Sequence, residues 1–196
     1  GTLGIITAAT LKLVPGVAER IVIWAGVSST QAARKLLLHC ETCVGNALEG
    51  FEILPQSSLD AVLEHVPTAR SPLSTRAPWH VLIEVVADRA DAESLRDRCE
   101  AMLESAFHET LIDDAVMSAN ETQAEAFWLI RDSISPAERA RGPAVQHDIS
   151  VPVEAMPDFI DMAIARMQAD WPGTHACAFG HLGDGNVHFH VIAPAG

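Results

Sequence analysis

Two short apolar segments near the carboxyl end of the chain, separated by a glycine-rich stretch, constrain the fold most strongly. Residues 174–181 and 187–192 are apolar and partly β-branched, which predicts two neighbouring β-strands. Between them, Asp184-Gly185 is typical of a two-residue type I′ turn, whose central residues need positive φ angles. We therefore expect a tight antiparallel hairpin, so the fold must contain a sheet.

Three histidines lie on this predicted hairpin. The register of a two-residue turn places His181 directly opposite His188. Opposed side chains in an antiparallel pair have Cβ atoms roughly 4.5–5.5 Å apart, which lets two imidazoles bind one metal ion. His190 shares a face with His188, because side chains alternate along a strand. The pattern predicts a metal or catalytic role, with hydrogen-bonded, half-buried strand histidines as the alternative.

Strand-like and helix-like segments alternate along the rest of the chain. Strands are predicted at 8–14, 20–27, 51–54, 79–87, 111–117 and 144–151, and helices at 30–47, 57–64, 91–106, 121–140 and 156–169. Pro136 should kink or restart its helix, because proline removes a backbone donor and clashes with the preceding turn. The alternation predicts an α+β fold of the ferredoxin-like type, with a mixed or antiparallel sheet and helices packed on one face.

The charge balance limits the possible partners. The chain has 26 acidic and 13 basic residues, for a formal net charge of −13, and no basic stripe, which argues against nucleic acid or an anionic membrane surface. Apolar stretches such as 21–27 are far shorter than the roughly 20 residues of a membrane span. We expect a cytoplasmic protein without a membrane span. Cys40 and Cys43 form a CxxC within a predicted helix, and we interpret them as half-buried helix residues.

Two further groups are candidates for chemistry. Arg131 ends the aromatic and apolar run 127–131, where a desolvated guanidinium would bind a carboxylate in a bidentate manner; a solvated arginine on a helix face is the alternative. On the next predicted strand, Gln146 and Asp148 share one face. Asp148 is a candidate partner that orients a ligand histidine, with an ordinary strand-end carboxylate as the alternative. The sequence contains no phosphate loop, dinucleotide fingerprint or serine nucleophile motif.

Four segments together resemble one enzyme family: GTLGIIT at 1–7, FWLIR at 127–131, HDISVPV at 147–153 and GHLGDGNVHFH at 180–190. They are similar to the flavin-dependent 2-hydroxyacid dehydrogenases of the vanillyl-alcohol oxidase superfamily, the group that includes D-lactate and D-2-hydroxyglutarate dehydrogenases. The resemblance covers essentially the whole chain. It implies that the parent protein oxidises a D-2-hydroxy acid to a 2-oxo acid by hydride transfer to FAD.

The resemblance also implies a division of the chain into two parts. Residues 1–16 match the end of an FAD-binding domain, and residues 17–196 match a substrate-binding cap domain, truncated at its carboxyl end. The first part would lie against FAD through Gly1, Thr2, Leu3, Gly4, Ile5 and Ile6. This fragment alone is expected to be inactive, because most of the flavin domain lies outside it.

Residues of the cap domain acquire roles from the same resemblance. His181 and His188 match ligands of a divalent metal, usually zinc, whose third ligand is a glutamate beyond the end of this sequence. Arg131 matches the arginine that pairs with the substrate carboxylate, and Ser135 matches a hydroxyl residue that assists it. The chain departs from the pattern at two substrate-facing positions, Gln146 in place of a frequent lysine and His190 in place of a frequent asparagine.

The implied mechanism assigns one task to each group. The metal binds the 2-hydroxyl and carboxylate of the acid and lowers the pKa of the hydroxyl, while His190, or a family histidine outside this chain, takes the proton. The implied partners are a small hydroxy acid and an electron acceptor. The oligomeric state stays open, with a homodimer as one possibility. A stand-alone metal- or ligand-binding α+β module without redox activity is the alternative function.

Overall fold

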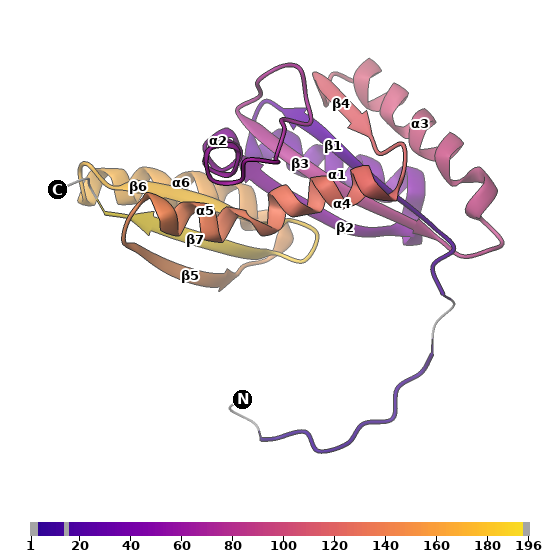
Figure 1. The fold of residues 1–196 in the computed structure, drawn as a ribbon, viewed down its shortest axis with the longest axis horizontal. Coiled ribbons are helices and arrows are strands. Elements are labelled where there is room, and N and C mark those ends of the chain that lie inside the picture. The colour runs from indigo at the N-terminus through magenta and orange to yellow at the C-terminus, as the bar shows by residue number, and fades with distance from the viewer. Residues whose placement is uncertain (1–3, 14–15, 194–196) are drawn as a thin grey trace.

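The computed structural model describes residues 4–13 and 16–193. The strands are β1 (Glu19–Val27), β2 (Leu48–Pro55), β3 (Trp79–Ala87), β4 (Asp114–Met117), β5 (Ala144–Ser150), β6 (His175–His181) and β7 (Asn186–Ile192). The helices are α1 (Thr30–Val44), α2 (Gln56–His65), α3 (Ala92–His108), α4 (Glu121–Asp132), α5 (Ile134–Arg141) and α6 (Met156–Asp170). Their order along the chain follows the predicted one (Figure 1), except for the strand predicted at 8–14 and the single helix predicted at 121–140.

One antiparallel sheet contains all seven of these strands, in the order β4-β1-β3-β2-β6-β7-β5. The first four strands with α1 and α3 form the β-α-β-β-α-β unit of a ferredoxin-like fold. The pairing of β2 with β6 then attaches the hairpin and β5 to that unit. The predicted α+β class and the ferredoxin-like antiparallel sheet are confirmed.

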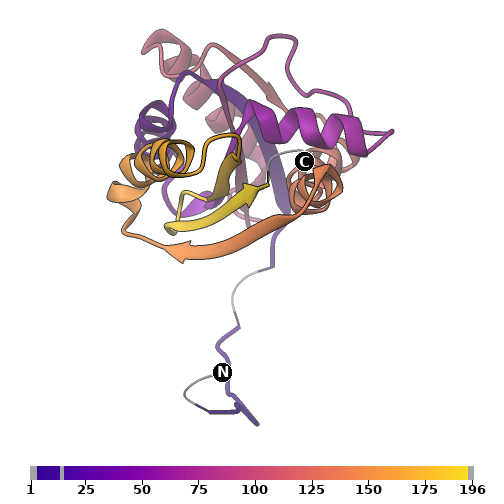
Figure 2. The same cartoon turned by 90° about the vertical axis from the view of Figure 1, so that its left-hand side faces the viewer.

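Helices cover both faces of this sheet, whereas the sequence pattern predicted one covered face. Ile21 and Ile23 of β1 pack in the core beneath α1 and α3, together with residues of α6. Val22 and Trp24, which alternate with them, pack in a second core with residues of α2, α4 and α5. Figure 2 shows the sheet between the two helix layers. The reason is visible in β1, whose residues 21–27 are apolar at every position and therefore bury both faces.

The helix predicted at 121–140 is two helices. Asn120 caps α4, because its side chain accepts a hydrogen bond from the backbone N–H of Gln123. The chain breaks at Ser133, and Pro136 then lies in the first turn of α5, where the missing N–H has no intrahelical partner to lose. The predicted restart of the helix at this proline is confirmed.

The hairpin turn differs from the predicted two-residue turn. Residues 182–185 form a four-residue loop, and His181 therefore pairs with Asn186 instead of His188. The carbonyl of His181 accepts hydrogen bonds from the amides of Asp184 and Gly185, which closes the loop. In this register, the residue opposite His188 is Phe179.

Two tertiary contacts explain the longer loop. Leu182 is fully buried in the core on the α1 side, and the amide of Gly183 donates to the carbonyl of Phe51 on β2. Gly185 has a φ of 79°, and a Cβ there would lie 2.0 Å from the carbonyl oxygen of Val151. Burial of Leu182 and close approach of Gly185 to Val151 thus outweigh the local preference of Asp-Gly for a tighter turn.

The amino-terminal segment was predicted to contain a strand at 8–14. Residues 8–13 contain no helix or strand, so the prediction is wrong there, and residue 14 lies outside the described residues. The segment extends away from the sheet (Figure 1), and a strand needs a hydrogen-bonded neighbour. Over the described part of the chain, no helix combines the length and apolarity that crossing a membrane requires.

Candidate functional site

A polar cluster lies on the α4 and α5 side of the sheet, where β2, β6, β7 and β5 run side by side. It consists of Glu52, Arg131, Asp148, His181 and His188. Glu52 pairs directly with His181 across β2 and β6, and Asp148 pairs directly with His188 across β5 and β7. The two histidines are diagonal neighbours, and their ring centroids are 5.5 Å apart. The shifted register thus keeps the two imidazoles together.

Each of these histidines has a carboxylate at Nδ1. His181 Nδ1 is hydrogen-bonded to Glu52 Oε1, and His188 Nδ1 is hydrogen-bonded to Asp148 Oδ1. Such a carboxylate holds the proton on Nδ1 and leaves the Nε2 lone pair for another partner. The predicted orienting role of Asp148 agrees with this contact. The arrangement is the one that metal-binding histidines commonly have.

The electrostatics of the two histidines differ. The hydrogen bond to Glu52 raises the pKa of His181, although partial burial opposes this shift. Burial lowers the pKa of His188, and its hydrogen bond to Asp148 only partly compensates. Burial alone would raise the pKa of Glu52, but the hydrogen bond from His181 and the charge of Arg131 outweigh it, so its pKa is lowered. Glu52 is therefore a buried carboxylate anion.

Arg131 is buried, in contrast to the solvated arginine that the sequence left as an alternative. Its exposed fraction is 8%, and its Nε donates to Glu52 Oε2 at 2.7 Å. The guanidinium carbon lies 5.1 Å from the centroid of the Phe179 ring, a distance suited to a cation–π contact. One edge and one face of the guanidinium are thus engaged, and the edge formed by Nη1 and Nη2 can receive a carboxylate.

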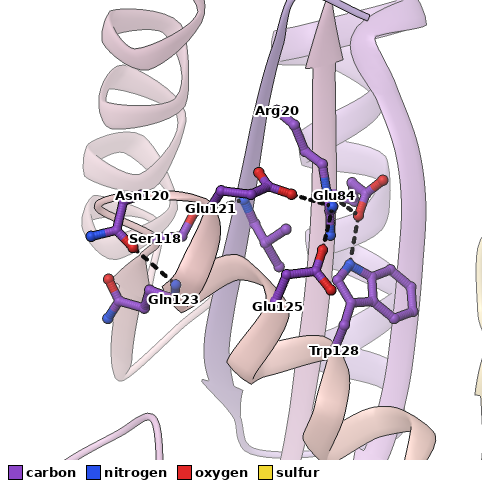
Figure 3. Close-up of polar contacts among 9 residues, drawn as sticks. Arg20, Glu84, Ser118, Asn120, Glu121, Gln123, Glu125 and Trp128 are labelled. Carbon is purple, nitrogen blue, oxygen red and sulfur yellow. Dashed lines mark hydrogen bonds and ion pairs between the residues drawn. The ribbon is translucent and has the colours of Figure 1, made fainter.

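A network at the other end of α4 anchors this helix to the sheet (Figure 3). Arg20 of β1 donates from Nη1 to Glu121 and Glu125, both at 2.8 Å, and from Nε to Glu84 at 3.1 Å. Glu84 of β3 also accepts from the indole N–H of Trp128. Together with the Asn120 cap, these contacts hold α4 across β1 and β3, which places Arg131 beside Glu52.

His190, the predicted base, lies deeper than the other two histidines. It is 3% exposed and pairs with Cys177 of β6 and with Gln146 of β5. His190 Nδ1 is 3.6 Å from Glu138 Oε2 of α5, and within the described chain neither atom has a hydrogen-bond partner. The ring packs edge-on against Phe179, with centroids 5.0 Å apart. His190 is therefore buried next to the polar cluster, against Phe179.

The remaining predicted residues have less defined surroundings. Gln146 is exposed on the edge strand β5, and Ser135 is half-buried in the first turn of α5. Of the predicted FAD-contacting residues, Ile5 and Ile6 are 91% and 87% exposed, and Gly4 is exposed as well. Gly1, Thr2 and Leu3 lie outside the described residues. The structure leaves the roles of all these residues as predictions.

Glu52 is the residue that the sequence analysis missed, although it contacts both Arg131 and His181. Its exposed fraction is 2%, and in the sequence it interrupts the apolar run of β2 between Phe51 and Ile53. A charged residue inside a buried strand needs a partner, because an unpaired buried charge is very costly. That local signal was available in the sequence, but its two partners were not.

Space for a ligand exists next to this cluster. A cleft of about 600 Å³ is lined by Glu52 and His181, by Glu84 and Trp128, and by hairpin residues that include Asp184. Several of these groups are acidic and would repel an anionic ligand. A bound cation would offset their negative charge. Among the residues that the structure describes, no group of three or more His, Cys, Asp or Glu side chains is arranged to hold a metal ion.

The fold and this cluster define an α+β domain that carries polar side chains on one face of a wide antiparallel sheet. A sequence model of the C-terminal domain of FAD-linked oxidases matches residues 18–196, and the chain belongs to this family.

Curated relatives are similar to the chain in sequence, and a solved structure is similar to it in fold. The chain is 30% identical over 193 residues to a mitochondrial D-2-hydroxyglutarate dehydrogenase of Arabidopsis thaliana and 28% identical over 197 residues to that of Danio rerio. These matches cover 98% and 100% of the chain but only 34% and 36% of the relatives, so the chain spans about a third of their length. The fold is also similar to p-cresol methylhydroxylase, with a TM-score of 0.58, 8% identity, and coverage of 91% of this chain and 39% of that one.

Proposed function

We propose that this chain is the substrate- and metal-binding part of an FAD-dependent enzyme that oxidises a D-2-hydroxy acid to a 2-oxo acid. The observation that supports this most is the convergence of Arg131, His181 and His188 on one sheet face. Arg131 presents a cationic edge to an anion, and each histidine is tied at Nδ1 so that Nε2 is free. This combination suits an acid that binds through its carboxylate and its neighbouring hydroxyl.

The proposed metal site is tested by the chemistry of its donors. His181 and His188 fit a zinc ion, because each ring in its neutral form offers Nε2 as a ligand while a carboxylate holds the proton on Nδ1. Two ligands are fewer than a stable site needs, and we propose that a third protein ligand lies outside this chain. When bound, the ion would supply positive charge that lowers the pKa of the 2-hydroxyl.

The protein groups around the acid would act as follows. Arg131 holds the carboxylate through its Nη1 and Nη2 edge, and Ser135 and Gln146 flank it from α5 and β5. His190 is the proposed acceptor of the hydroxyl proton. FAD supplies the hydride acceptor when bound. We propose that Gly1, Thr2, Leu3, Gly4, Ile5 and Ile6 contact FAD in the full-length parent.

The names of the relatives suggest D-2-hydroxyglutarate as the first acid to test. Its second carboxylate would need another anchor, and Gln146 offers hydrogen bonds without charge. A shorter acid such as D-lactate places no demand on that position. The preference between these two acids therefore depends on how well a neutral amide replaces a cation.

The test is turnover by the full-length parent with D-2-hydroxyglutarate, D-lactate and their L-enantiomers, using an artificial electron acceptor. We expect oxidation of a D-acid only, loss of activity with a chelator and recovery with zinc. A parent that binds no flavin and oxidises none of these acids would overturn the proposal and favour a ligand-binding module without redox activity.

A further inference from the structure

The mechanism proposed above gives Glu52 no role beyond its hydrogen bond to His181. Glu52 is almost completely buried on β2, and its neighbours in the strand, Phe51 and Ile53, belong to the apolar core on the opposite side of the sheet. A carboxylate removed from water destabilises the folded state unless partners compensate its charge. Glu52 has two such partners, Arg131 and His181, and each engages a different oxygen.

The first oxygen fixes the orientation of Arg131. Glu52 Oε2 accepts from Nε at 2.7 Å, and the ring of Phe179 lies under the guanidinium plane. Because the planar guanidinium is held at Nε and on one face, the edge formed by Nη1 and Nη2 can point in only one direction. Glu52 thereby decides where an incoming carboxylate can bind.

The second oxygen fixes the tautomer of His181. Glu52 Oε1 accepts the proton on Nδ1, so the ring presents Nε2 as a bare acceptor. Asp148 acts on His188 in the same way, but Asp148 is exposed and has no contact with Arg131 among the hydrogen bonds of the described residues. The two carboxylates therefore differ, since only Glu52 joins a histidine to the arginine.

We propose that Glu52 is a positioning residue that sets the carboxylate-binding edge of Arg131 and the metal-binding nitrogen of His181 in one fixed relation. This inference rests on the proposed function. A 2-hydroxy acid presents its carboxylate and its hydroxyl a fixed distance apart, so its two binding groups must also keep a fixed separation. One rigid carboxylate that contacts both groups supplies that separation.

Substitution of Glu52 in the full-length parent tests the proposal through two independent readouts. The first is the Kd for zinc, measured by calorimetry on the metal-free protein, and the second is the KM for D-2-hydroxyglutarate or D-lactate at saturating zinc. Glu52→Gln keeps the shape but offers one acceptor oxygen for two N–H donors. We expect both readouts to weaken about tenfold or more, because the substitution disturbs the contacts with His181 and with Arg131 together.

Two further variants separate positioning from simple packing. Glu52→Asp retains two acceptor oxygens and should restore both readouts above the level of Glu52→Gln, even though it shortens the side chain. Asp148→Asn is the comparison variant, because it affects His188 and has no contact with Arg131: it should weaken zinc binding but raise the KM at saturating zinc less than Glu52→Gln does. Thermal unfolding of each variant verifies that the protein is folded.

The possible results distinguish this inference from the proposed function. If the wild-type parent binds no zinc and oxidises no hydroxy acid, both are wrong. If the wild type does both and Glu52→Gln leaves either readout within twofold, only the inference is wrong. It is also wrong if Glu52→Asp is no better than Glu52→Gln, or if Asp148→Asn raises the KM as much as the Glu52 variants do.

Discussion

Acidification should destabilise this fold through one buried histidine, His80. The side chain is fully buried on β3 between Trp24 and Gln56. The indole N–H of Trp24 is only a donor, so His80 Nδ1 must accept it at 3.1 Å, and His80 Nε2 lies 3.0 Å from Gln56 Oε1. A charged His80 would carry a proton on Nδ1 that faces the indole N–H. The folded state therefore requires the neutral ring.

The size of the effect follows from the pKa of His80. Burial lowers this pKa to about 4, with a smaller contribution from Arg76 that Asp60 opposes. In the unfolded chain His80 has an ordinary pKa near 6.5, so the unfolded state takes up the proton first as the pH falls. The free energy of unfolding is therefore highest above pH 6.5 and decreases between pH 6.5 and 4. At about 1.4 kcal/mol per pH unit, roughly 2 kcal/mol is lost by pH 5.

Urea unfolding of the 196-residue chain at pH 7.5 and pH 5, followed by circular dichroism, measures this loss. His80→Gln removes the titrating group and keeps a neutral side chain with an acceptor for Trp24. The variant should be less stable than the wild type at pH 7.5. Between pH 7.5 and pH 5, its free energy of unfolding should fall by about 2 kcal/mol less than that of the wild type. Carboxylates and the other histidines titrate in both proteins and cancel in the comparison. Equal pH dependence in the two proteins would refute the reasoning.

Three further predictions concern the α4 cap, Arg131 and the hairpin histidines. Asn120→Ala removes the α4 cap and should cost about 1 kcal/mol in urea unfolding, whereas Asn120→Asp should cost much less because it still accepts the N–H bond. Arg131→Lys should lower kcat/KM for the acid in the full-length parent at least tenfold, since lysine lacks the planar fork; unchanged kinetics would rule out the carboxylate role. His181→Ala or His188→Ala should abolish the recovery of chelated parent on zinc addition, while His190→Ala should leave zinc binding by calorimetry intact. If both hairpin variants recover fully, the paired-histidine interpretation is wrong.

Local patterns in the sequence predicted most of the helices and strands and the α+β, ferredoxin-like class. The predicted strand 79–87 coincides with β3, and the restart of the helix near Pro136 occurs because proline acts through its own backbone. These features depend on residues within a few positions of one another. The predicted strand at 8–14 was wrong over its described residues, since the apolar pattern alone cannot supply a neighbouring strand.

The hairpin shows where local information stops. The sequence predicted the two strands and the presence of His181 and His188 on one face, and both features are found in the structure. The register was decided by tertiary packing, because burial of Leu182 and the bond between Gly183 and Phe51 favour a longer loop. A turn preference worth little energy loses to such contacts.

Which residues come together in the polar cluster was decided even more strongly by the tertiary structure. The residue types of Arg131 and the histidines marked them as candidates, because their chemistry is carried by the side chain itself. Glu52 is 79 residues from Arg131 and 129 residues from His181 along the chain. Only the pairing of β2 with β6 and the placement of α4 over the sheet bring these three together. Residue chemistry is thus read from the sequence, whereas the partner of a buried charge is set by long-range packing, which no local pattern encodes.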